Sequence, residues 1–200
     1  MVKSLAAITV YLVITIGYVS INRLNVGREA AFLPTFLDTF FPFNRHWVWP
    51  YYFYFVLLFI PFFFIKTWRG LKAALLAYGI TTAISLGFYA FWPTGIDRPL
   101  IIANDLSAKL LKFIYEGDKP YNCFPSQHVG FSWTAAVVIF QEKRTLGIIA
   151  VIAAILISLS TVFIKQHWFV DMPGGIAVAI IAWLVSYKIV FKESAKIATK

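Results

Sequence analysis

Six apolar segments constrain the fold of this chain more than any other feature of its sequence. They lie at roughly residues 4–22, 47–65, 71–91, 128–140, 146–164 and 168–191. Crossing the hydrocarbon core of a bilayer takes about 20 residues of α-helix, and these apolar residues come in continuous blocks without the alternation of barrel strands. The sequence therefore predicts an all-α integral membrane protein, a bundle of six transmembrane helices. No repeat or low-complexity linker divides it, so we expect residues 1–200 to form a single membrane-embedded domain.

Composition also indicates a membrane protein. Hydrophobic residues make up 60% of the 200 residues and charged residues only 14%, which is too apolar for a soluble domain of this size. The net charge of +9 comes from small groups of basic residues between the apolar segments, and not from a basic stripe of the kind that binds nucleic acid. The expected partner is the bilayer and not nucleic acid, and the oligomeric state is left open.

The distribution of lysine and arginine predicts the orientation. With a cytoplasmic amino terminus, the inside segments hold ten basic and two acidic residues, and the opposite side holds eight basic and seven acidic residues. Basic residues favour the cytoplasmic side. Both termini of this multi-pass protein are therefore expected in the cytoplasm, with the loops at 23–46, 92–127 and 165–167 on the extracytoplasmic face of the cell membrane. The first segment could instead be a signal peptide, but no small-residue cleavage pattern follows it.

The outer loops hold the unusual polar residues of the chain. Two of its three histidines, His128 and His167, stand at the mouths of apolar segments, and titratable groups at membrane depth are candidates for function. Asp171 follows His167 by four residues, which is one helical turn on the same face. Its carboxylate can accept a hydrogen from one imidazole nitrogen and leave the other free to attack.

The fourth apolar segment starts in a way that suits an anion. Pro125 and Ser126 are typical of a helix start, where backbone amides such as those of Ser126 and Gln127 can hold phosphate oxygens. Only about 13 residues run from His128 to Phe140, which is short of a full crossing. We therefore expect the outer end of this helix, and the site, to lie just below the lipid headgroups.

Other side chains can complete an anion site. Arg98 offers a planar fork and Lys165 a point charge to the same phosphate, and His128 is placed to protonate a leaving alkoxide. The single cysteine, Cys123, is interpreted as a packing residue. No histidine and cysteine cluster has metal-ligand spacing in the sequence, so we expect neither a metal nor another cofactor.

One further helix is expected between the third and fourth segments. Apolar residues recur there with an amphipathic helix period, and Asn104 or Asp105 can cap the start. The apolar positions are Leu106, Leu110, Leu111, Ile114 and Tyr115. The sequence predicts an interfacial helix that lies on the membrane surface before the fourth span.

Together these residues resemble a known family. Arg98-Pro99, Pro125-Ser126-x-His128, and Ser160 followed by His167 and Asp171 are similar to the three signatures of the type 2 phosphatidic acid phosphatase superfamily. The resemblance implies that His167 is the nucleophile that becomes phosphorylated, Asp171 its partner and His128 the general acid. It implies Arg98, Ser126 and Gln127 as phosphate ligands, and chemistry without a metal.

Two departures from the signatures concern cations. Phe91 stands where the family usually has lysine, and Thr161 where it usually has arginine. Lys165 is the one nearby replacement. The stretches "STVFIKQHWFVD" and "LDTFFPFNRHWVWPYY" look more like the branch with inositol phosphorylceramide synthases.

The predicted function is a metal-independent phosphatase of lipid phosphates. Phosphatidic acid, phosphatidylglycerol phosphate and polyprenyl diphosphate are the expected kinds of substrate, cleaved through a phosphohistidine. The alternative is a lipid phosphotransferase that passes the phosphoryl group or phospho-headgroup to an alcohol such as inositol or a sugar. A non-enzymatic transporter or scaffold would explain the apolar segments equally well, but not the convergence of two histidines and an aspartate.

Overall fold

A computed structural model of the chain describes residues 2–197, and these residues are mostly helical. Its α-helices are α1 (Val2–Leu24), α2 (Val48–Leu57), α3 (Ile60–Phe64), α4 (Trp68–Phe91), α5 (Leu106–Gly117), α6 (Gln127–Glu142), α7 (Arg144–Phe163) and α8 (Asp171–Ile197). Between α1 and α2 lie two short 3-10 helices, η1 (Phe36–Phe40) and η2 (Arg45–Trp47). Two-residue strands β1 (Ala31–Phe32) and β2 (Thr94–Gly95) pair in parallel and tie the connection after α1 to the connection after α4.

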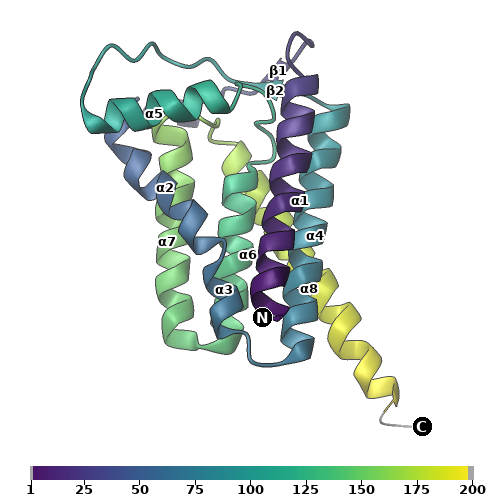
Figure 1. The fold of residues 1–200 in the computed structure, drawn as a ribbon. Coiled ribbons are helices and arrows are strands. Elements are labelled where there is room, and N and C mark those ends of the chain that lie inside the picture. The colour runs from purple at the N-terminus through teal and green to yellow at the C-terminus, as the bar shows by residue number, and fades with distance from the viewer. Residues whose placement is uncertain (1, 198–200) are drawn as a thin grey trace.

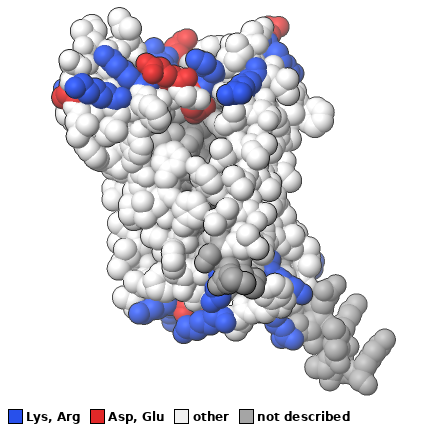
Figure 2. Space-filling view, in the orientation of Figure 1, with Lys and Arg blue, Asp and Glu red and all other residues white. Residues whose placement is uncertain are grey.

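The long helices run side by side, with the connecting segments divided between two ends (Figure 1). Helix α5 and the β1–β2 pair lie at one end, and the start of α1 lies at the other with the end of α8. The three loops that were predicted to share one face therefore do lie together. Charged side chains gather at both ends and leave the band between them uncharged on the face shown in Figure 2, as expected for a bundle that sits in lipid.

Four helices are long and apolar enough to cross a membrane by length and composition. They are Leu5–Leu24, Trp68–Phe91, Arg144–Phe163 and Asp171–Phe191. The other two predicted spans differ, because α6 has 16 residues and the second apolar segment is divided into α2 and α3. The chain is thus indicated to be a helical membrane protein, while the predicted count of six crossings is not confirmed.

Pro61 explains the division of the second segment. It occupies the first turn of α3, where a missing N–H is tolerated, whereas in a continuous helix its ring would clash with the preceding turn. The Leu58 carbonyl at the break accepts a hydrogen bond from the buried Tyr78 hydroxyl at 3.1 Å. This bond matters because a backbone carbonyl exposed to lipid has no water to pair with.

Helix α5 confirms the amphipathic helix predicted before α6. Its N-cap is Asp105, whose carboxylate accepts from the Ala108 amide at 3.0 Å. Ala108, Leu111 and Ile114 are buried on one side, and Phe113 is 71% exposed on the other. The buried side forms an apolar cluster, named here the α5 cluster, that also contains Val48, Tyr51, Ile101 and Ile164. Helix α5 therefore covers the ends of α2 and α7, next to the two predicted catalytic histidines.

Candidate active site

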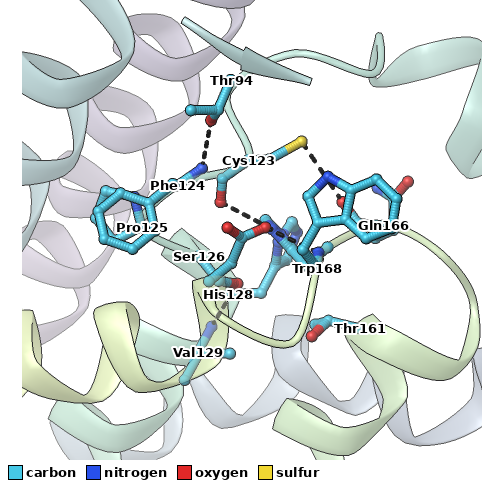
Figure 3. Close-up of polar contacts among 12 residues, drawn as sticks. Thr94, Cys123, Phe124, Pro125, Ser126, His128, Val129, Thr161, Gln166 and Trp168 are labelled. Atoms are coloured by element: carbon cyan, nitrogen blue, oxygen red, sulfur yellow. Dashed lines mark hydrogen bonds and ion pairs between the residues drawn. The ribbon is translucent and has the colours of Figure 1, made fainter. Parts of the chain in front are cut away.

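The start of α6 is built as the sequence predicts. Ser126 is the N-cap, and its hydroxyl accepts from the Val129 amide at 3.4 Å. Just before it, the Phe124 amide donates to the Thr94 hydroxyl at 2.7 Å, which ties the segment to β2 (Figure 3). These bonds place His128 in the first turn of α6, at the same end of the bundle as α5.

The connection from α7 to α8 positions the second histidine. The Thr161 carbonyl accepts from the amides of Gln166, at 2.9 Å, and His167, at 3.1 Å. Lys165 adopts a positive φ of 50°, which is uncommon for a residue other than glycine. Asp171 then opens α8, and its carboxylate accepts from the Trp168 amide at 2.9 Å. This tight turn faces His167 back toward α6.

Helices α6 and α8 meet closely where they begin. The Ser126 amide donates to the Asp171 carbonyl at 3.1 Å. A Cβ atom on Gly175 would lie 2.5 Å from the Ser126 carbonyl oxygen and 2.9 Å from Val129 Cβ. Only glycine fits there, because any side chain would separate the two helix starts and the histidine and aspartate that they carry.

The three residues predicted to be catalytic are brought together. His128 Nδ1 lies 3.3 Å from His167 Nε2, although 39 positions separate them in the chain. His167 Nδ1 lies 3.2 Å from a carboxylate oxygen of Asp171 and 2.9 Å from the Cys123 carbonyl oxygen. All three side chains are buried. Their catalytic roles stay predictions, but the required proximity is present.

The neighbours of His167 decide its tautomer. Both groups facing Nδ1, a carboxylate and a backbone carbonyl, accept hydrogen bonds and cannot donate them. Nδ1 must therefore carry the hydrogen, and Nε2 has the lone pair in the neutral ring. This is the arrangement a histidine nucleophile needs, with one nitrogen held and the other free to attack.

Cys123 comes close to the same groups, which its sequence position did not predict. Ligand atoms of Cys123, His167 and Asp171 lie within 4.8 Å of one another. Burial raises the pKa of the Cys123 thiol, and the charge of Arg98 offsets only part of that rise, so the thiol keeps its proton. The Cys123 thiol donates to the Gln166 carbonyl at 3.9 Å, and it is the backbone carbonyl of Cys123 that holds His167 Nδ1. The expected independence of metal stays a prediction.

Asp118 and Gln166 belong to the site although no signature contains them. Asp118 accepts from the Tyr18 hydroxyl at 2.7 Å and from Gln166 Nε2 at 2.8 Å. Burial raises the pKa of Asp118, and the Arg98 guanidinium, 4.0 Å away, lowers it in part. In the sequence Asp118 is one more acidic residue of an outer loop, and its partner Tyr18 lies 100 positions away, so no local pattern reveals it.

The four predicted phosphate ligands are placed differently from one another. Arg98 donates to the carbonyls of Tyr115 and Asp118, and its Nε has no partner among residues 2–197. The Ser126 amide is already bonded to the Asp171 carbonyl, so its hydroxyl is the part that remains for a phosphate. Lys165 donates to the Phe41 carbonyl at 2.6 Å. Burial lowers the pKa of Lys165, with Asp38 acting in the opposite sense.

Gln127 gives the clearest sign of a binding position. Together with His128 it lines a cavity of about 80 Å³ whose other walls are Ile14, Thr15, Tyr18 and Tyr54. The Gln127 side chain is 4% exposed, and its Nε2 has no hydrogen-bond partner within the described part of the chain. Buried amide groups are normally paired, so a donor left free beside His128 is suited to a phosphate oxygen.

Neither position that lacks the usual family cation supplies a substitute. Phe91 is 90% exposed at the end of α4. Thr161 is fully buried, and its hydroxyl donates to the Ser158 carbonyl at 2.7 Å. Arg98 and Lys165 are therefore the cations of the predicted site that the structure describes.

Comparison with known proteins identifies the family of this chain. Residues 73–195 match the family model described as the PAP2 superfamily. The chain belongs to the PAP2 superfamily. The matched range contains His128, His167, Asp171 and Arg98, whereas Tyr18 on α1 and all of α2 lie outside it.

Two further similarities place this PAP2 superfamily chain among its relatives. It is 31% identical over 64 residues to a "PA-phosphatase related-family protein" of Dictyostelium discoideum, a match that covers 32% of the chain but only 12% of that protein. Among solved structures, the crystal structure of Aquifex aeolicus LpxE superposes with a TM-score of 0.51 at 25% identity. That match covers 84% of this chain and 92% of LpxE, so the similarity extends over most of the helical bundle.

Proposed function

We propose that this PAP2 superfamily chain hydrolyses a phosphomonoester or diphosphate bond of a membrane lipid through a phosphohistidine. The observation that carries the proposal is the geometry of His167, whose Nδ1 lies between two acceptors while Nε2 faces His128 at 3.3 Å. A nucleophile with a fixed tautomer next to a proton donor suits two-step phosphoryl transfer. The PA-phosphatase name of the Dictyostelium relative supports the same reaction class.

In the first step His167 Nε2 attacks phosphorus, so that a P–N bond forms as the P–O bond to the lipid breaks. The leaving oxygen takes the Nδ1 proton of His128, which enters this step as the imidazolium and leaves it as the neutral ring. A phosphoryl group cannot fit between two nitrogens 3.3 Å apart, so substrate entry must break their contact and free the His128 N–H for the leaving oxygen. In the second step water attacks phosphorus, gives a proton to His128 and releases inorganic phosphate from His167.

The positions of Gln127 and Arg98 suggest how phosphate is held. Within residues 2–197, neither the buried Gln127 Nε2 beside His128 nor the Arg98 Nε has a hydrogen-bond partner. Donors directed at the phosphoryl oxygens stabilise the charge that the transition state spreads over them. Ser126 and Lys165 stay predicted ligands, Ser126 through its hydroxyl.

The size of the cavity favours water over a larger acceptor. Pockets for drug-sized molecules measure about 300–1,000 Å³, whereas the cavity next to His128 measures about 80 Å³. A water fits in this space beside His128, whereas a sugar would need a rearrangement beyond the one that separates the two histidines. Hydrolysis is our first proposal, and transfer to an alcohol remains the alternative.

The substrate class can be tested with purified protein in detergent. We expect phosphate release from at least one of phosphatidic acid, phosphatidylglycerol phosphate and undecaprenyl diphosphate, and no loss of rate with excess EDTA. Each lipid is assayed with and without inositol, glycerol and glucose. Absence of free phosphate from all three, with phosphate moved to an alcohol instead, would establish the transferase. Loss of activity with EDTA that added Zn²⁺ or Mg²⁺ restores would refute the metal-free mechanism.

We further propose one membrane domain with six crossings, in which α2 with α3 and the short α6 complete the bundle. We place both termini in the cytoplasm, because α1 begins and α8 ends at the same end of the bundle (Figure 1) and the sequence segments assigned to that side carry the excess of basic residues. A protease site added before Met1 should then be cut only after the cytoplasmic face is opened. Cleavage by a protease added outside intact cells would contradict the proposed orientation.

A further inference from the structure

Tyr51, on α2, makes a contact with His128 that the two-step mechanism above does not use. Its hydroxyl lies 2.7 Å from His128 Nε2, the ring nitrogen that faces away from His167. The two rings also pack together, with centroids 4.8 Å apart. Tyr51 is 1% exposed. A buried hydroxyl at this distance makes a strong hydrogen bond.

The partners of the Tyr51 hydroxyl give this bond a direction. Gln166 Nε2, which can only donate, lies 3.4 Å from the same oxygen and also donates to Asp118 at 2.8 Å. Because His167 Nε2 carries the lone pair, the neutral His128 ring in this structure donates from Nδ1, so the Tyr51 hydroxyl directs its hydrogen at His128 Nε2 while its oxygen accepts from Gln166. The hydrogen of His128 is then on Nδ1, the atom that faces His167.

A hydroxyl also suits the two roles assigned to His128. His167 Nδ1 faces only acceptors, so that nitrogen stays protonated throughout. His128 must instead give a proton in one step and take one in the next. As the imidazolium, His128 donates its Nε2 hydrogen to the Tyr51 oxygen, and after Nδ1 gives its proton to the leaving oxygen the neutral ring keeps that Nε2 hydrogen and can take a proton back at Nδ1. In the resting neutral ring, whose hydrogen is on Nδ1, the hydroxyl donates to Nε2 instead, which a carboxylate or carbonyl could not do. Tyr51 can thus remain bonded to His128 in both protonation states.

Packing holds Tyr51 in place. It belongs to the α5 cluster, where Val48, Leu111 and Ile164 are also buried. Close-packed interiors restrict a side chain to one rotamer, and a tyrosine has few rotatable bonds to begin with. The hydroxyl is therefore presented to His128 from a rigid surface.

We propose that Tyr51 is the positioning residue for His128, which keeps Nδ1 of that ring directed at the reacting phosphoryl group through both steps of the reaction. The proposal rests on the role of His128 in the function proposed above. It concerns a residue outside the range matched by the family model, and Tyr51 acts only through His128 and touches no substrate.

The test is Tyr51→Phe, which removes the hydroxyl and keeps the ring. We expect kcat for a long-chain alkyl phosphate to fall by about 10- to 100-fold, the usual effect of removing a group that orients a functional histidine, with KM changed less than about threefold. The comparison with p-nitrophenyl phosphate uses kcat/KM, which reports on phosphorylation of His167 and not on the later hydrolysis that both substrates share. For p-nitrophenyl phosphate kcat/KM should fall much less than for the alkyl phosphate, because a nitrophenolate leaves without a proton. A general loss of folding would lower both values of kcat/KM together, and equal losses in kcat/KM would overturn the proposal.

Tyr52→Phe is the matched control, since it removes a hydroxyl from the neighbouring residue. The Tyr52 hydroxyl donates to the Leu110 carbonyl at 3.3 Å, away from both histidines. The Tyr52→Phe variant should keep the wild-type kcat for both the alkyl phosphate and p-nitrophenyl phosphate. Wild-type rates in Tyr51→Phe, at an unchanged melting temperature, would also overturn the proposal.

His128→Ala separates this proposal from the proposed function. If His128 is the proton donor, its loss should show the same dependence on the leaving group with a larger effect, about 10²- to 10⁴-fold for the alkyl phosphate. Full activity of His128→Ala would refute the function proposed for that residue. A strong leaving-group effect in His128→Ala and none in Tyr51→Phe would refute only the role of Tyr51.

Discussion

Replacing His167 by alanine is expected to lower phosphate release from lipid phosphates by about 10⁴-fold or more, because no other group can form the P–N bond. Among residues 2–197, the groups beside His167 are His128, which the proposed mechanism uses as the proton donor, and the Cys123 thiol, whose pKa is raised by burial. The measurement is free phosphate in detergent, with the folded state checked by melting temperature. A labelled phosphate on the wild-type protein should be stable in base and labile in acid, and absent from the variant.

His46→Ala is the matched control for that experiment. His46 is exposed, and its ring contacts the Ser107 hydroxyl at 3.1 Å. It lies outside all three family signatures in the sequence. It should keep the wild-type rate and the labelled phosphate. Retention of full activity in His167→Ala, with the same label on the protein, would refute the phosphohistidine mechanism.

Asp171→Asn is expected to lower kcat by about 10³-fold, less than loss of the nucleophile. An asparagine oxygen can still accept from His167 Nδ1 and the Trp168 amide, and the Cys123 carbonyl also holds that Nδ1 hydrogen. The tautomer should therefore survive. What is lost is the negative charge that stabilises the positively charged imidazole ring while Nε2 carries the phosphoryl group.

Rates for Asp171→Asn should be compared with those for Asp97→Asn, which neutralises an exposed carboxylate beside Arg98. The rate of the Asp97→Asn control should remain within about twofold of the wild-type rate, since the charge of an exposed side chain is largely screened by solvent. Single-turnover assays should show slower formation of the labelled protein in Asp171→Asn. An unchanged rate of labelling would mean that the carboxylate does not support the nucleophile.

Local sequence patterns predicted the parts of this structure that depend on neighbouring residues. The Ser126 cap, the start of α5 at Asp105 and the four-residue spacing of His167 and Asp171 each involve one helical turn. The division of the second segment at Pro61 was missed, although a proline within an apolar block is a signal for it. Residues 47–65 are apolar throughout, so their hydropathy gave no sign of the break between α2 and α3.

The network around His128 could not be predicted in the same way. Tyr51 lies 77 positions before His128, and Gln166 reaches Tyr51 across 115 positions. Such pairs are set by how the helices pack, and one sequence records no pairing between distant positions. Tyr51 stood in an aromatic stretch that is typical of any membrane interface.

Charged side chains were also harder to place than caps. Lys165 was predicted beside the phosphate, and its amine donates to the Phe41 carbonyl in this structure, while its role as a phosphate ligand stays a prediction. Arg98 is bonded to the carboxyl end of α5 through the Tyr115 and Asp118 carbonyls. Long flexible side chains choose among several acceptors within reach, and only the folded chain shows which of them are near.

The two histidines lie toward the α5 end of the bundle and not at its middle, because both belong to helix starts or loops at that end. Lipids whose headgroups lie in the opposite leaflet would have their phosphates about 30 Å away, across the hydrocarbon core. Such an enzyme draws its substrate from one leaflet. Any pool made on the other side becomes available only after transbilayer movement of the lipid, so the rate of that movement would limit how much of the pool is dephosphorylated.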